Sequence, residues 1–105
     1  FGGCNTSFSA FSMGIPIVTM PADFINGRFT YGLYKKMNIM DLVAYNMEDY
    51  VKLANKCAMD KTWRNNISNK IKSLLNLIFN EVDSINTWIN FCVEVCNNKY
   101  NSYLR

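Results

Sequence analysis

The stretch GGCNTSFSAFSMGIPIVTMP, residues 2–21, decides the fold class of this chain. It starts with two glycines, continues through a run of polar residues and reaches a third glycine at position 14, where a helix would end. The next six residues, Ile15 to Met20, are mostly β-branched or apolar, which is typical of a strand buried on both faces. The stretch therefore predicts a glycine turn, a helix and a buried parallel strand.

After this stretch, the sequence predicts one more helix and one more strand, and then only helices. Residues 27–37 carry apolar side chains at helical spacing, and residues 40–45 form a short apolar run that indicates a second strand. Three helices are expected to follow: one capped by Asn46, one from Asp60 to Phe79 and one from about Glu81 to Asn97. Alternating strands and helices imply a parallel sheet, so we expect an α/β fold.

Two strands as short as these cannot form a stable sheet by themselves. We therefore expect the chain, which begins at Phe1, to be a segment of a longer protein whose earlier strands complete the sheet. The expected architecture is the C-terminal portion of a Rossmann-like domain that ends in long amphipathic helices.

Composition excludes several classes of protein. Half of the 105 residues are hydrophobic and 18% are charged, a globular composition. Histidine is absent, so histidine-based acid–base chemistry and metal ligation cannot come from this segment. The net charge is only +3 and the basic residues are spread along the chain, so no nucleic-acid partner is expected. No apolar run approaches the roughly 20 residues of a membrane span.

The four cysteines are Cys4, Cys57, Cys92 and Cys96. They form no CxxC pair and have no histidine partner, so the common zinc spacings are missing and no metal site is expected. We interpret them as buried free thiols, because free cysteine behaves as a small hydrophobic residue. Free thiols and the lack of a signal-like leader favour a cytoplasmic, reducing compartment.

The strongest chemical signal is the polar run after the two glycines. A helix N-terminus offers unpaired N–H groups and the positive end of the helix dipole, both of which favour phosphate. Glycines also let the backbone approach a ligand closely. The run matches neither GxGxxG nor the Walker pattern, and polar residues after a glycine turn also start ordinary helices. From the residues alone, a phosphate site and a plain helix start both stay open.

Taken together, these features resemble the nucleotide-binding segment of O-GlcNAc-transferase-like glycosyltransferases. That family has a Gly-rich turn, a run of hydroxyl residues, a helix ending in Met-Gly or Ala-Gly, and a strand that PIVTMP at 16–21 matches. The similarity continues through NGR at 26–28, LVA at 42–44 and EDY at 48–50. GLYKK at 32–36 is also similar to bacterial cytoplasmic N-glucosyltransferases.

The resemblance implies a GT-B fold, in which two Rossmann-like domains enclose the active site. Residues 1–60 would be the end of the nucleotide-sugar-binding domain, and residues 61–105 the helices that close it. The parent enzyme would transfer N-acetylglucosamine or glucose from a UDP-sugar donor to a protein or other acceptor, with no cofactor and no metal. Its first domain, absent from this segment, would be the partner onto which Trp88, Tyr100 and Tyr103 dock.

The resemblance also assigns site residues. Asn5, Thr6 and Ser7 would bind the donor diphosphate, with Cys4 at the edge of the site. The family has an acidic residue for the ribose hydroxyls where this chain has Ser9, which would offer a weaker, neutral hydrogen bond. No catalytic residue is assigned to this segment.

Asp23 lies in the loop that follows the first expected strand, at the carboxyl end of the strand, where ligands bind in α/β proteins. Asp23 would be a site-edge residue or a plain turn residue. Arg28 would face a phosphate or pin the loop to a neighbouring helix. Two other functions stay open: a nucleotide-sugar epimerase of the same fold, and a non-catalytic binding or scaffold homologue whose partner surface is the helix from Asp60 to Phe79.

Overall fold

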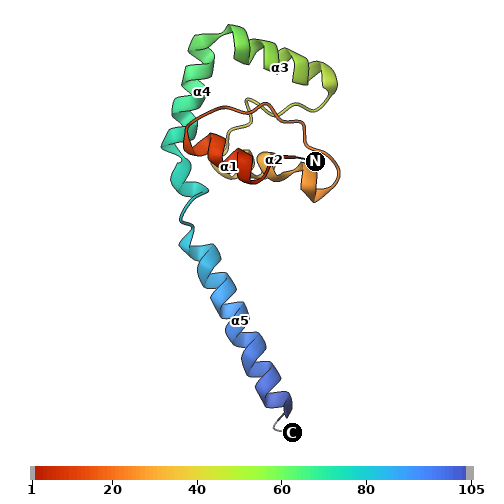
Figure 1. The fold of residues 1–105 in the computed structure, drawn as a ribbon, viewed down its shortest axis with the longest axis vertical. Helices are drawn as coiled ribbons and strands as arrows, with labels where there is room; N and C mark the ends of the chain where they lie inside the picture. Colours follow the sequence, from red (N-terminus) through yellow and green to blue (C-terminus); the bar gives the residue numbers. More distant parts are fainter. Residues whose placement is uncertain (1, 104–105) are drawn as a thin grey trace.

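The computed structural model describes residues 2–103 of the chain, and the side chains up to Asn98. These residues form the helices α1 (Asn5–Ser12), α2 (Phe29–Met37), α3 (Met47–Met59), α4 (Lys61–Ser73) and α5 (Val82–Tyr103), with short 3₁₀ turns η1 (Ile25–Gly27) and η2 (Leu75–Leu77). The first four helices form a body from which α5 extends (Figure 1). The radius of gyration is 18.6 Å, well above the roughly 13 Å of a compact chain of this length.

The predicted helix signals are confirmed at three helix ends. The side-chain oxygen of Asn46 accepts a hydrogen bond from the Asp49 N–H at 2.8 Å, and Asp60 accepts one from the Trp63 N–H at 2.9 Å. Gly14 follows the end of α1 with a positive φ of 71°, a conformation that glycine adopts without strain. The helix expected to reach Phe79 ends earlier, because the chain turns into η2 and packs Leu74, Leu75 and Ile78 against the core.

The predicted sheet is not found in the part of the chain that the structure describes. The two expected strand segments lie side by side, but a single parallel bridge joins them, between Thr19 and Val43. The Thr19 N–H donates to the Leu42 carbonyl at 3.0 Å, and the Ala44 N–H donates to the Thr19 carbonyl at 2.8 Å. The prediction of a Rossmann-like α/β fold is therefore not confirmed. Two short extended segments without a further strand provide too little pairing for a sheet.

A tyrosine side chain occupies the position of a pairing strand beside the first extended segment. The hydroxyl of Tyr34 accepts a hydrogen bond from the Ile17 N–H at 2.8 Å and donates one to the Ile17 carbonyl at 2.9 Å. The side chain is completely buried, and burial raises the pKa of the Tyr34 phenol well above its ordinary value of 10.0. Tyr34 thereby fixes the extended segment to α2.

The core lies between α1, α2, α4 and the second extended segment. Its largest fully buried side chains are those of Phe11, Tyr34, Met37, Ile39, Leu42 and Ile71. The rings of Phe11 and Tyr34 pack with their centroids 4.8 Å apart. Burying one such side chain stabilises the fold by roughly 1.5–3 kcal/mol. This packing holds the start of α1 in a fixed position relative to the two extended segments.

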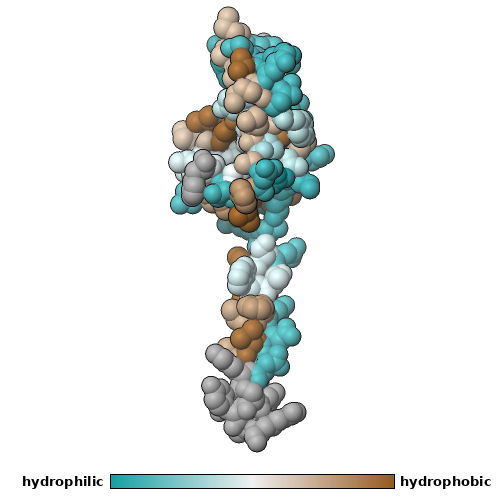
Figure 2. Space-filling model, turned by 90° about the vertical axis from the view of Figure 1, so that its right-hand side faces the viewer, coloured by the Kyte–Doolittle hydropathy of each residue, from teal (hydrophilic) through white to brown (hydrophobic). Residues whose placement is uncertain are grey.

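The last helix differs from the others because no described side chain of α5 is buried. Hydrophobic side chains gather along it (Figure 2), and Trp88 is 68% exposed. The prediction that Cys92 and Cys96 are buried is wrong: both are exposed, because α5 leaves the body and packs on no surface within the described residues. The side chains of Tyr100 and Tyr103 lie outside the described ones. No described helix is both long and apolar enough to span a membrane.

Candidate functional site

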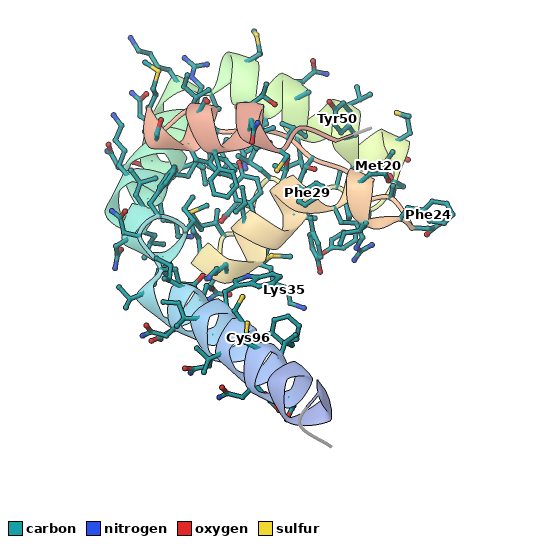
Figure 3. All side chains as sticks on the ribbon, turned by 60° about the horizontal axis from the view of Figure 1, so that its bottom comes forward. Met20, Phe24, Phe29, Lys35, Tyr50 and Cys96 are labelled. Carbon is teal, nitrogen blue, oxygen red and sulfur yellow. The ribbon has the colours of Figure 1, made fainter. Side chains whose placement is uncertain are left out.

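A hollow of about 420 Å³ lies where α1 begins, beside the carboxyl end of the extended segment 17–20. Its walls come from the glycine turn, the first turn of α1, the extended segment, the loop before α2, and single residues of α2 and α3. Figure 3 shows Tyr50 of α3 and Met20 on this side of the body, and both line the hollow. No lining residue carries a charge, so an anion would meet no carboxylate in the hollow.

One hydrogen bond holds the glycine turn against the loop before α2, and a second close approach lies within that loop. The Gly2 N–H donates to the Asn26 carbonyl at 2.9 Å, and a Cβ at Gly2 would approach that oxygen to 3.0 Å. A Cβ at Gly27 would lie 2.6 Å from the Cβ of Ala22. A side chain at Gly27 would clash with Ala22, and one at Gly2 would force the Asn26 carbonyl to shift, so glycine suits the close approach at both positions.

The start of α1 leaves backbone donors open. Cys4 is the N-cap of α1, and its side chain makes no capping hydrogen bond. Asn5, Thr6 and Ser7 therefore form the first turn of the helix. The N–H groups of Asn5 and Thr6 donate to no group within residues 2–103. Free N–H groups at a helix start are suited to bind an anion.

The structure brings only some of the expected diphosphate residues to the hollow. Thr6 and Ser7 line it, whereas Asn5 and Ser9 are exposed and do not. Cys4 is half-buried beside the turn. The hollow therefore contains the middle of the predicted polar run, and the ends of the run lie outside it.

The hydroxyl of Ser7 faces the protein. It donates to the Gly3 carbonyl at 3.0 Å and lies 2.7 Å from the Oγ1 atom of Thr30, on α2. Both side chains are buried, and Thr30 also lines the hollow. Sequence reasoning missed Thr30, because nothing in the sequence connects it with residues 23 positions earlier. It also gave Tyr50 no role in the site, although Tyr50 belongs to the matching EDY stretch.

Asp23 and Arg28 lie outside the hollow. Asp23 is exposed in a bend, with no lining contact. The Arg28 guanidinium donates to the Ala22 carbonyl at 2.8 Å and lies 5.0 Å from the ring centroid of Tyr31. These contacts hold the Arg28 side chain on its own loop and on the first turn of α2.

The first extended segment presents an unpaired backbone edge to the hollow. Ile17 and Thr19 pair with Tyr34 and the second segment, whereas the backbone groups of Val18 and Met20 have no partner within residues 2–103. Both residues line the hollow. Open polar backbone groups in a hollow need a ligand, water or another chain segment to satisfy them.

Comparison with known proteins gives one consistent result. The family described as "Glycosyl transferase family 41" matches residues 2–81. The probable UDP-N-acetylglucosamine–peptide N-acetylglucosaminyltransferase SPINDLY of Petunia hybrida is 31% identical over 75 residues, which are 71% of this chain. The chain spans only 8% of the length of that relative. No solved structure gives a significant match.

Proposed function

Because the chain belongs to glycosyl transferase family 41, we propose that it is the part of a glycosyltransferase that holds the diphosphate of a UDP-sugar donor at the start of α1. The observation that carries this proposal is the uncharged hollow beside the first turn of α1, which Thr6 lines and where the N–H groups of Asn5 and Thr6 have no acceptor within residues 2–103. The sugar in this proposal is N-acetylglucosamine or glucose, and the acceptor is a protein or another molecule.

The chemistry of such a site is electrostatic. When the bond between sugar and diphosphate breaks, negative charge develops on the leaving UDP. Fixed N–H donors and the helix dipole at the diphosphate stabilise that charge more than they stabilise the bound donor. Thr6 adds a hydroxyl from within the hollow, and Ser9, exposed further along α1, is assigned to the ribose. In this proposal, the group that activates the acceptor belongs to another part of the parent enzyme.

The exposed side of α5 also has a place in this proposal. A helix with apolar residues such as Trp88, Phe91 and Val95 more than 40% exposed requires a covering surface. In a two-domain GT-B enzyme, the first domain of the longer chain supplies that surface. Activity would then need both parts, and the 105 residues alone would transfer no sugar.

Calorimetry with UDP on the full-length protein tests the donor site. Changing Thr6 and Ser7 together to Ala should weaken UDP binding by about 1–3 kcal/mol, the range for lost hydrogen bonds to a charged group. Thr62→Ala is the matched control, because Thr62 is an exposed threonine in the first turn of α4 and does not line the hollow. An unchanged dissociation constant in the double variant would refute the assignment.

A further inference from the structure

Two buried hydroxyls converge on one carbonyl beneath the hollow. The Gly3 carbonyl accepts a hydrogen bond from Ser7 at 3.0 Å, and the Thr30 hydroxyl lies 3.3 Å from the same oxygen. Ser7 and Thr30 are 3% and 6% exposed, and their oxygens are 2.7 Å apart. The group joins the glycine turn, α1 and α2, which are far apart in the sequence and meet at the hollow.

The proton count and the distances together favour one direction for these hydrogen bonds. Each hydroxyl has one proton to donate. If Ser7 gives its proton to Gly3, the short contact with Thr30 requires the proton of Thr30. Two arrangements use both protons, and the one with the shorter bond to the carbonyl is that in which Thr30 donates to Ser7 and Ser7 donates to the Gly3 carbonyl. In such a chain each bond polarises the next and strengthens it.

This series of hydrogen bonds fixes the direction of the Cys4 N–H. The Gly3–Cys4 peptide is trans, so its N–H points opposite to its carbonyl. Because the two hydroxyls hold the carbonyl, they also hold the Cys4 N–H, which has no acceptor within residues 2–103. The next N–H groups along the chain are the open donors of Asn5 and Thr6. If the carbonyl were released, the turn would tilt. The N–H groups of Cys4, Asn5 and Thr6 would then no longer be held in a fixed direction relative to the hollow.

Glycine at position 3 is part of the same arrangement. A Cβ there would lie 2.5 Å from the Thr6 Oγ1 atom and 3.0 Å from the Ser7 Oγ atom. The turn therefore packs directly against Thr6 and Ser7, two of the hydroxyl residues that line the hollow.

We propose that Thr30 is a positioning residue of the donor site, which acts through Ser7 and the Gly3 carbonyl to orient the N–H groups that receive the diphosphate. The inference rests on the proposed function, because it specifies how that site is built. Thr30 touches no substrate in this account. Its effect falls on the phosphate part of the ligand and leaves binding of the nucleoside part unchanged.

The test compares UDP with uridine on the full-length protein, by calorimetry or competition. Thr30→Val keeps the shape of the side chain and removes its hydroxyl, and Thr30→Ser keeps the hydroxyl. We expect Thr30→Val to weaken UDP binding roughly tenfold, which corresponds to about 1.4 kcal/mol, with uridine binding unchanged and UDP binding restored in Thr30→Ser. Should Thr30→Val fail to fold, Ser7→Ala interrupts the same chain at its middle and should give the same selective loss.

Each other outcome has a definite meaning. UDP binding that is unchanged in Thr30→Val overturns the positioning role and leaves the proposed function standing. Equal losses for UDP and uridine overturn it as well, because they indicate a general structural role. A wild-type protein that binds no UDP overturns the proposed function and the positioning role with it.

Discussion

The body and α5 both carry large hydrophobic side chains, and among the described residues only the body buries any of them completely. Phe11 of α1 is completely buried, whereas Phe91 of α5 is 56% exposed. The body has α1, α2 and α4 packed around one core, and α5 meets it chiefly at its start, where Glu81 forms an ion pair with Lys36 of α2. The comparison teaches that an amphipathic pattern predicts a helix and its apolar face. Burial of that face depends on a second surface being present.

The two phenylalanines provide the largest expected contrast. Phe11→Ala should lower the free energy of unfolding of this chain by about 3–5 kcal/mol, because it empties a fully packed site in the core. Phe91→Ala should change it by no more than about 1 kcal/mol, because only its edge-on contact with Trp88 is lost. Urea unfolding of the chain measures both. Similar losses for the two variants would show that α5 is packed on the body in solution.

Tyr34→Phe should have an intermediate effect. It leaves the N–H and the carbonyl of Ile17 without their hydrogen-bond partner, so the free energy of unfolding should fall by about 1–3 kcal/mol. Circular dichroism of the variant during urea unfolding checks this. A loss below the measurement error would mean that water replaces the hydroxyl at Ile17.

Because Tyr34 is buried, we expect the free energy of unfolding to depend on pH. Burial raises the pKa of Tyr34 in the folded chain above its value near 10 in the unfolded chain, so the folded state holds the phenol proton more tightly. The stabilisation is complete below about pH 10 and is lost as the pH rises from there toward the folded pKa. Unfolding curves between pH 8 and roughly pH 11 should show this loss in the wild type, and Tyr34→Phe should lack that part of it.

Changes on the exposed side of α5 should have the smallest effect on the body. Replacing Ile85 and Ile89, which are 55% and 54% exposed, by Gln should alter the free energy of unfolding by only about 0.5 kcal/mol for each residue. The same change should reduce the binding of a hydrophobic dye, because it removes much of the open apolar surface. Unchanged dye fluorescence would place the open surface on the body instead.

The helices were predictable from the sequence because their signals are local. Asn46 and Asp60 cap helices through residues three positions away, and Gly14 ends α1 through its own backbone freedom. The sheet was not, because a strand needs partners from distant parts of a chain. Within PIVTMP, only Thr19 forms a β-bridge in the described structure, with Val43, which lies more than 20 residues away. At Ile17 the hydroxyl of Tyr34 takes the place of a partner strand.

The candidate site was predictable only in outline. The glycines and polar residues of the turn indicated a helix start open to an anion, and the structure places Thr6 and Ser7 at a hollow there. The inward direction of the Ser7 hydroxyl and its contact with Thr30 depend on how α2 packs against α1. Local sequence carries no signal for such a contact.

Hydrogen exchange of the full-length protein, with and without UDP, tests the donor site most directly. UDP should slow exchange of the amides at the start of α1, in peptides that cover residues 2–12, because the diphosphate takes up their open N–H groups. Peptides that cover residues 85–98 of α5 provide the internal reference and should exchange at the same rate in both states. Bound UDP, verified by calorimetry, with no protection within residues 2–12 would contradict the account.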